Sequence, residues 1–336
     1  MWGKLSSLPF SMLRNGRLES LPHMNCYPIL NHAEHAFGSL DFSINSTSFS
    51  RWHELSIMMV VESAGITDIG KKRKGNEDAM LLDDDLKLYV VADGMGGHQA
   101  GEVASRLVVE TIRDYMMRFK TDGKEVEELI DSDVSVSREA NRLLSGVHLA
   151  NWSVNQLSQS KECYRGMGST VSAVYFTDEI LVAANVGDSP IYLVHNGTIE
   201  MLSVPHTVLA EQAALNPDGA VHIDSRFGHM LTRAMGVEET VKADVCEIQC
   251  FKGDVLVIGS DGLSNKVSPE EILAVVTRER PDRACRSLVD LANERGGDDN
   301  ITAVVIKVKA VKRKQTGIKE LISRLMGGLF VSPSGR

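Results

Sequence analysis

Acidic residues recur where apolar, strand-like runs begin or end in this sequence, and a carboxylate in that position can bind a cation. They are Glu77 and Asp78 before AMLL, Asp93 after VVA, Asp188 after AANVG, Asp261 after VLVIGS, and Asp298 and Asp299 before ITAVVIKV. One Asp-Gly pair is usually a turn, but five acidic strand ends in one chain favour a shared site. Carboxylates that converge without Lys or Arg repel one another unless a cation neutralises them. Oxygen ligands without His or Cys favour Mg²⁺ or Mn²⁺ over Zn²⁺.

The glycine-rich stretch after Asp93 does not have the spacing of a nucleotide-binding loop. A dinucleotide-binding loop needs G-x-G-x-x-G at the start of a helix, whereas the glycines here are Gly94, Gly96, Gly97 and Gly101. A P-loop is excluded because no Gly-Lys-Ser/Thr follows. What remains is a carboxylate at the end of a strand, followed by a glycine that turns easily and exposes its carbonyl oxygen. Both oxygens suit a hard cation.

The charge distribution limits the partners. The chain of 336 residues has 43% hydrophobic and 24% charged residues, as globular proteins do, and its apolar runs are much shorter than the roughly 20 residues that span a membrane. Residues 1–57 carry four basic and four acidic residues, and residues 309–336 carry seven basic residues and one Glu. Since the total is −9, residues 58–308 hold −15. So acidic a body repels polyanions, which argues against nucleic acid as a partner.

The five cysteines are scattered, with neither a CxxC pair nor the spacing of a zinc site. They indicate free thiols, and we expect a cytoplasmic protein.

Three segments follow from the sequence pattern. Residues 1–57 show no sustained period and are expected to form a poorly ordered extension. Residues 58–309 alternate strand-like and helical runs, and the four runs between residues 169 and 204 predict an antiparallel meander. Helices are expected over about 101–119, 135–159, 268–278 and 282–294. Grouped strands with helices between them favour an α+β fold.

The third segment, residues 310–336, is a basic amphipathic tail in which apolar residues recur at helical spacing opposite Lys and Arg. Two interpretations remain. The tail is a terminal helix docked on its own domain or frayed, which we favour, or a helix for a membrane surface or a partner.

Seven motifs resemble, in order and spacing, those of the metal-dependent serine/threonine protein phosphatases, the PPM or type 2C family, in their bacterial form. They are RKGNED, VVADGMGGHQAGEVAS, MGSTVSAVYF, AANVGDSPIYLV, LTRAMG, GDVLVIGSDGL and GGDDNITAVVI. The match covers about residues 59–308, so residues 58–309 are interpreted as the phosphatase domain. The resemblance implies an α+β fold, a four-layer α-β-β-α sandwich with two central antiparallel sheets and the metal site at one end.

The resemblance also implies a core site for two Mn²⁺ or Mg²⁺ ions. By position, Asp93 matches the carboxylate that bridges the two ions, with the Gly94 carbonyl on one of them. Asp261 and Asp299 match ligands of the other ion. The acids that match those holding its coordinated waters are Glu77 and Asp78.

Two further roles are implied. Asp188, together with Asp261, matches residues that hold a third, weaker ion. Arg73 matches the catalytic arginine that grips the substrate phosphate, for which its planar fork is suited. The alternative for Arg73 is that it belongs only to a solvated basic run, residues 71–74.

The implied activity is hydrolysis of phosphoserine and phosphothreonine in proteins by attack of a metal-bridging hydroxide, without a phosphorylated enzyme intermediate. Expected partners are phosphorylated proteins, including a cognate Ser/Thr kinase and its substrates, and we expect a monomer. One alternative is a catalytically inactive module of the same fold that binds phosphoproteins, although the complete acid set argues against it. Another is a dedicated regulatory phosphatase that controls sigma factors or secretion assembly, which differs in substrate and not in chemistry.

Three positions depart from the family pattern. Met95 stands where many eukaryotic members have a histidine that protonates the leaving group, and we do not transfer that role to His98. Pro190 replaces an Arg in GDSP, and Pro205 replaces an Asp that commonly precedes the residue at His206. None of the three is a predicted metal ligand.

Overall fold

The computed structural model describes residues 57–96, 99–121, 133–177, 180–215 and 225–313. The predicted extension, residues 1–57, lies outside the described residues except for Ile57, and so does the predicted tail except for residues 310–313. His98 also lies outside them.

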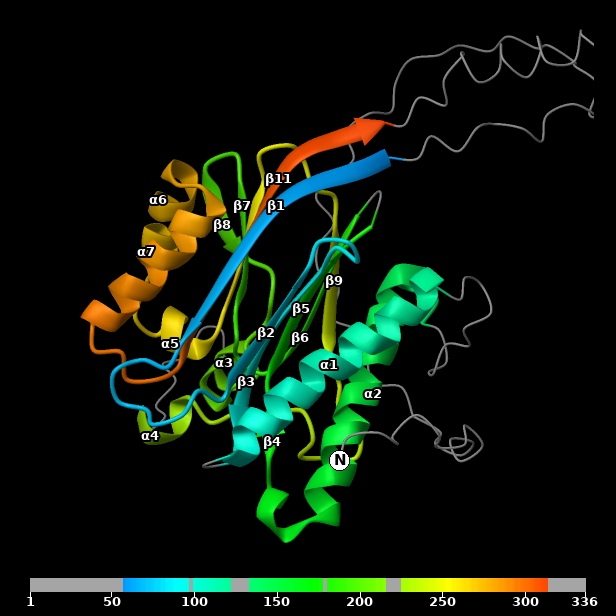
Figure 1. Ribbon diagram of the computed structural model, residues 1–336, viewed down its shortest axis with the longest axis vertical. Coiled ribbons are helices and arrows are strands. Elements are labelled where there is room, and N and C mark those ends of the chain that lie inside the picture. The colour runs from blue at the N-terminus through cyan, green and yellow to red at the C-terminus, as the bar shows by residue number, and fades with distance from the viewer. Residues whose placement is uncertain (1–56, 97–98, 122–132, 178–179, 216–224, 314–336) are drawn as a thin grey trace, which may run out of the picture. The chain divides into compact units, whose positions relative to one another are not determined.

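Two antiparallel sheets form the centre of the domain (Figure 1). The first sheet has, in spatial order, β1 (Ile57–Asp68), β11 (Ile301–Arg313), β10 (Val255–Gly259), β7 (Ile191–His195) and β8 (Thr198–Met201). The second has β2 (Asp78–Asp83), β3 (Leu88–Met95), β5 (Val171–Phe176), β6 (Leu181–Val186) and β9 (Asp244–Ile248), with the short β4 (Gly168–Ser169) paired to β3.

Helices cover the outer face of each sheet. On the second sheet lie α1 (Gln99–Thr121) and α2 (Arg138–Ser160), which is followed by the 3₁₀ turn η3 (Glu162–Tyr164). On the first sheet lie α5 (Asp261–Ser264), α6 (Pro269–Arg278) and α7 (Pro281–Glu294). Two short helices, α3 (Val208–Leu215) and α4 (Ser225–Gly228), lie in the segment between β8 and β9. The predicted four-layer α-β-β-α sandwich is confirmed.

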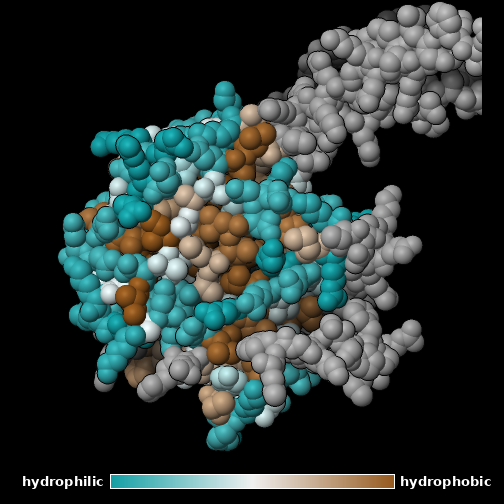
Figure 2. All heavy atoms as spheres, in the orientation of Figure 1, coloured by the Kyte–Doolittle hydropathy of each residue, from teal (hydrophilic) through white to brown (hydrophobic). Residues whose placement is uncertain are grey.

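Strand β3 shows why its sequence is apolar at nearly every position. Leu88, Val90 and Ala92 pack among the residues of α1 and α2, whereas Tyr89 and Val91 pack between the two sheets. A strand buried on both faces has no reason to alternate polar and apolar residues. In the orientation of Figures 1 and 2, apolar side chains gather over β1 and β2, which are edge strands of the two sheets.

The predicted meander over residues 169–204 is wrong as a single unit. β5 pairs with β6 in one sheet, but β7 pairs with β8 and β10 in the other. The chain crosses between the sheets at GDSP, where Gly187 has a φ of +102° and Pro190 has no N–H to donate to a strand. The crossover places Asp188 at one end of the sandwich, between the sheets.

Other differences concern boundaries. Strand β11 continues to Arg313 and pairs with β1 back to Ile57, so residues 310–313, predicted as tail, extend the first sheet. The short helices α3, α4 and α5 were not predicted, because each is too brief to show a helical period. Among the described helices, none combines the length and the apolar character that crossing a membrane requires.

Candidate active site

The β2–β3 pair brings the first two predicted acids together. Asp78 begins β2, and its partner in the antiparallel register is Asp93 in β3. Residues directly opposite each other point to the same face of a sheet, and Tyr89 and Val91 show that this face of β3 is directed at the other sheet. Asp93 was predicted at the end of its strand, whereas β3 continues for two more residues, to Met95.

The first sheet contributes two more acids. Asp261 follows β10 as the first residue of α5, and Asp299 precedes β11, the neighbour of β10. The end of one strand and the start of the next meet here because the two strands are antiparallel. The Thr302 hydroxyl of β11 donates to Asp78 Oδ2 at 2.6 Å and so joins the acids of the two sheets.

Asn300 braces the loop that precedes β2, a role that the sequence analysis missed. Its side chain is buried; Oδ1 accepts from the Glu77 N–H at 2.8 Å, and Nδ2 donates to the carbonyls of Ile69 and Gly75, both at 3.0 Å. The sequence feature that could have revealed this role is the position of Asn300 in GGDDNI, directly after two acids at the start of a strand. This bonding holds Glu77 beside the cluster.

Arg73 lies in the same loop, and the structure brings it to the acids. Its Nη2 donates to Asp299 Oδ2 at 2.7 Å. Burial lowers the pKa of Arg73, but the carboxylates of Asp299, Glu77 and Asp93 outweigh it and raise that pKa. The neighbouring Lys72 pairs instead with Asp298. The basic run is thus not uniform, although the phosphate role of Arg73 stays a prediction.

Gly94 stands where a side chain has no room. A Cβ atom there would lie 2.1 Å from the Gly101 carbonyl oxygen and 2.6 Å from that of Glu77. The Gly94 N–H donates to the Glu77 carbonyl at 3.1 Å. The absence of a side chain therefore allows the start of α1 to pack directly against the end of β3.

The electrostatics tie four predicted acids into one cluster. Burial, followed by the charges of Asp261 and Asp299, raises the pKa of Asp78 to about 7. Burial and the charges of Asp78 and Asp261 raise the pKa of Asp93 well above its ordinary value. Burial and the charge of Asp299 raise that of Asp261. For Asp188, burial and then the charge of Asp261 raise the pKa to about 6.

The cluster fits a divalent cation. Asp78 Oδ1 and Asp261 Oδ1 are buried without a hydrogen-bond partner in the described part of the chain, and a positive charge would relieve both these oxygens and the mutual repulsion. Among the described residues, no three His, Cys, Asp or Glu side chains form a complete metal-binding group. Asp299 is turned to Arg73, and Asp78 to Thr302.

Comparisons with known proteins agree with this site. The protein phosphatase 2C family matches residues 64–301. A putative 2C-type protein phosphatase of Streptococcus pyogenes is 34% identical over 249 residues, which are 71% of this chain and 94% of that protein. The catalytic domain of the serine/threonine protein phosphatase PstP, solved with two manganese ions, is 28% identical with a TM-score of 0.63, over 75% of this chain and all of that one.

A third comparison concerns regulation. PppA of Pseudomonas aeruginosa, described as a key regulatory component of the type VI secretion system, is 30% identical with a TM-score of 0.62, over 74% of this chain and 97% of that one.

With the family match covering most of the described residues, the sandwich fold and the carboxylate cluster have a common explanation: this chain belongs to the protein phosphatase 2C family.

Proposed function

We propose that this chain, a metal-dependent protein serine/threonine phosphatase of the 2C family, holds two Mn²⁺ or Mg²⁺ ions with Asp93, the Gly94 carbonyl, Asp261 and Asp299. The observation that carries the proposal is the pair of buried, unpartnered oxygens of Asp78 and Asp261, within a cluster of carboxyls whose pKa values are raised. All of these donors are oxygens, which Mn²⁺ and Mg²⁺ prefer.

Three acids complete the proposed site. Glu77 and Asp78 hold waters around the ion bound by Asp261, and Asp188 joins Asp261 in holding a third, weaker ion. The charge of Asp261 acts on both Asp78 and Asp188, which supports a shared position for the three.

When bound, divalent ions activate water and offset negative charge on the phosphoryl group. The chain's own residues hold and orient the substrate. We assign substrate phosphate binding to Arg73, whose side chain is half exposed yet reaches Asp299. A planar guanidinium can pair with two phosphate oxygens, and a phosphate dianion would compete with Asp299 for it. Lys74 is exposed and serves as the comparison residue.

The inactive phosphoprotein-binding alternative is not supported. The matched family and the PstP structure are named as phosphatases, and this chain retains every acid that the resemblance requires.

For substrates, we propose phosphorylated proteins that include a cognate Ser/Thr kinase and its targets, in the cytoplasm. Cys163, Cys250 and Cys285 are free thiols, as a reducing compartment favours. The similarity to PppA makes proteins that regulate secretion candidate substrates. Phosphoproteomics of a strain that lacks the protein would identify the targets.

The test is hydrolysis of a phosphothreonine peptide by metal-stripped protein before and after Mn²⁺ is added. We expect activity only with the metal, and a loss of at least about 100-fold in Asp93→Asn, which removes the negative charge of a proposed ligand. Asp114→Asn, an exposed acid on α1, is the control and should keep the wild-type rate. Full activity without metal, or a wild-type rate in Asp93→Asn, would refute the proposed site.

A further inference from the structure

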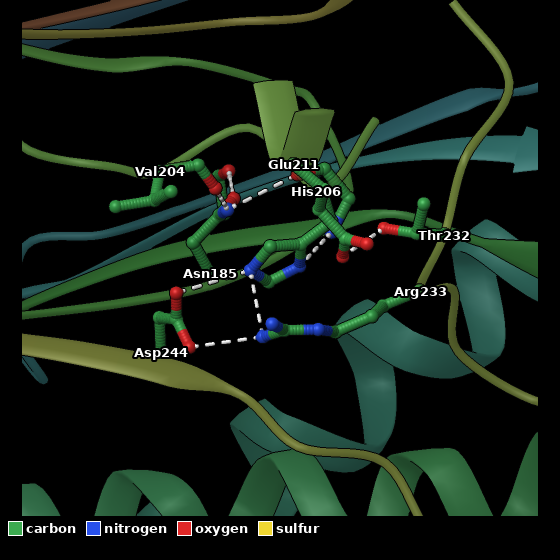
Figure 3. Close-up of polar contacts among 9 residues, drawn as sticks. Asn185, Val204, His206, Glu211, Thr232, Arg233 and Asp244 are labelled. Atoms are coloured by element: carbon green, nitrogen blue, oxygen red, sulfur yellow. Dashed lines mark hydrogen bonds and ion pairs between the residues drawn. The ribbon is translucent and has the colours of Figure 1, made fainter. Parts of the chain in front are cut away.

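A polar network surrounds His206, which is buried at the start of the segment between β8 and β9. His206 Nδ1 lies 3.1 Å from the Gly187 backbone nitrogen, and Nε2 lies 3.1 Å from Asp244 Oδ2. Because a backbone N–H can only donate, Nδ1 accepts, so Nε2 carries the hydrogen and donates to Asp244. Arg233 Nη1 lies 3.1 Å from the same Nε2, but since both atoms are donors this contact is not a hydrogen bond to the ring. Arg233 Nη1 donates to the other carboxylate oxygen, Oδ1, at 3.0 Å. Figure 3 shows the three side chains pointing toward one another.

The network fixes the Gly187 peptide groups on both sides. The Gly187 N–H donates to His206, and its carbonyl accepts from the His206 N–H at 2.9 Å and from Asn185 Nδ2 at 3.2 Å. Gly187 has a φ of +102°, and a Cβ atom there would lie 2.6 Å from Thr170 Cγ2. Asp188 is the next residue, so the direction of its side chain depends on how this glycine is held.

The returning part of the β8–β9 segment is bound to the same histidine. The Thr232 N–H donates to the His206 carbonyl at 2.9 Å, and the Thr232 hydroxyl donates to Glu211 Oε1 at 2.7 Å. Arg233 directly follows Thr232, so this backbone bond places its guanidinium at the network.

Asp244 supplies the negative charge at the centre. It is the first residue of β9 and lies opposite Asn185 of β6 in the ladder. Burial raises the pKa of Asp244, but the hydrogen bond from His206 and the charge of Arg233 outweigh burial and hold that pKa below its ordinary value. An ionised carboxylate thus bridges His206 and Arg233 at neutral pH.

We propose that His206, Arg233 and Asp244 are positioning residues for Asp188. His206 holds the Gly187 backbone, and Asp244, itself held by Arg233, fixes the His206 ring. The Asp188 carboxyl is thereby directed toward Asp261, where the third, weaker ion is proposed to bind. The inference rests on the role proposed for Asp188, and the experiment separates the two.

The experiment is calorimetric titration of Mn²⁺ into metal-stripped protein, which reads binding and not turnover. We expect Asp188→Asn to abolish the weakest class of sites. Asp244→Asn should weaken that class by about tenfold or more, the usual effect of losing a residue that orients a ligand, and leave the tighter sites within about twofold.

The matched control is a second His–Asp contact, between the last residue of β7 and a buried acid directly before β10. His195 Nδ1 lies 2.7 Å from Asp254 Oδ1, and Asp254 is 3% exposed. Asp254→Asn should lose stability without changing Mn²⁺ binding. If Asp244→Asn fails to fold, Arg233→Gln takes its place, because that side chain is 30% exposed.

Three outcomes would overturn the inference. If Asp188→Asn abolishes the weak class but Asp244→Asn leaves it intact, the positioning role is refuted and the proposed function stands. If Asp254→Asn weakens Mn²⁺ binding as much as Asp244→Asn, the effect is general destabilisation. If Asp188→Asn keeps the weak class of Mn²⁺ sites, both the positioning role and the assignment of Asp188 are refuted. The tighter sites still test the two-ion proposal in that case.

Discussion

Replacing Asp78 with asparagine should stabilise the metal-free protein at pH 8. The side chain is buried, accepts one hydrogen bond from Thr302 and leaves Oδ1 without a partner among the described residues. Burial, followed by the charges of Asp261 and Asp299, raises its pKa from 3.8 to about 7. Because the pKa in the folded protein is the higher one, the folded state binds the extra proton. The stabilisation that comes from binding this proton is fully present below about pH 4 and is lost as the pH rises to about 7.

The magnitude follows from the same numbers. A pKa that rises from 3.8 to about 7 corresponds to about 4 kcal/mol, at about 1.36 kcal/mol for each pH unit. In a domain of about 250 residues, 1 kcal/mol moves Tm by about 2–4 °C. The metal-free Asp78→Asn variant should therefore melt about 10 °C above the wild type at pH 8 and close to it at pH 4.

The assay is thermal melting of metal-stripped wild type and variant between pH 4 and pH 8. The variant should show a shallower fall in Tm with pH and not a flat line, because Asp93 and Asp261 still titrate. Asp114→Asn is the control and should follow the wild-type curve, since Asp114 is exposed on α1. A metal-free Asp78→Asn variant that melts below the wild type at pH 8, and whose Tm falls with pH as steeply as that of the wild type, would refute the raised pKa of Asp78.

Arg73→Ala should raise KM and lower kcat on a phosphopeptide at saturating Mn²⁺, with a total loss of transition-state stabilisation on the order of 2 to 4 kcal/mol. Lys74→Ala should cost well under 1 kcal/mol. Equal effects of the two substitutions would show that Arg73 is only part of the solvated basic run. Asp261→Asn should abolish hydrolysis while urea unfolding stays cooperative, and a near-normal rate would show that the site is misplaced. Gly94→Ala should lower the free energy of unfolding by more than about 2 kcal/mol in urea melts, because its Cβ meets the Gly101 carbonyl at 2.1 Å; an unchanged midpoint would contradict that packing.

The acidic strand ends were predictable because each depends on a local pattern. A run of β-branched and apolar residues that stops at Asp or Gly marks a strand end wherever it occurs, as at Asp261 after VLVIG. That such ends converge depends on two sheets that pack face to face, and the family motifs implied that packing. Even so, Asp93 lies inside β3, because β3 continues past the acid to pair with β4.

The contacts that hold the cluster were not predictable from local patterns. Arg73 and Asp299 are separated by 226 positions, and Asp78 and Thr302 by 224. Such pairs are set by register between distant strands and loops. The change of sheet at Gly187 was missed for a related reason, since a short Gly-Asp turn between two apolar runs has the same sequence signature in a hairpin and in a crossover.

The most direct test of the two-ion site is anomalous diffraction from crystals of the protein grown with Mn²⁺. We predict two strong anomalous peaks about 4 Å apart, with Asp93 between them, the Gly94 carbonyl at one peak and Asp261 and Asp299 at the other. Peaks that lie away from Asp93, or a fully active crystallised enzyme with no peak at these carboxylates, would contradict the assignment.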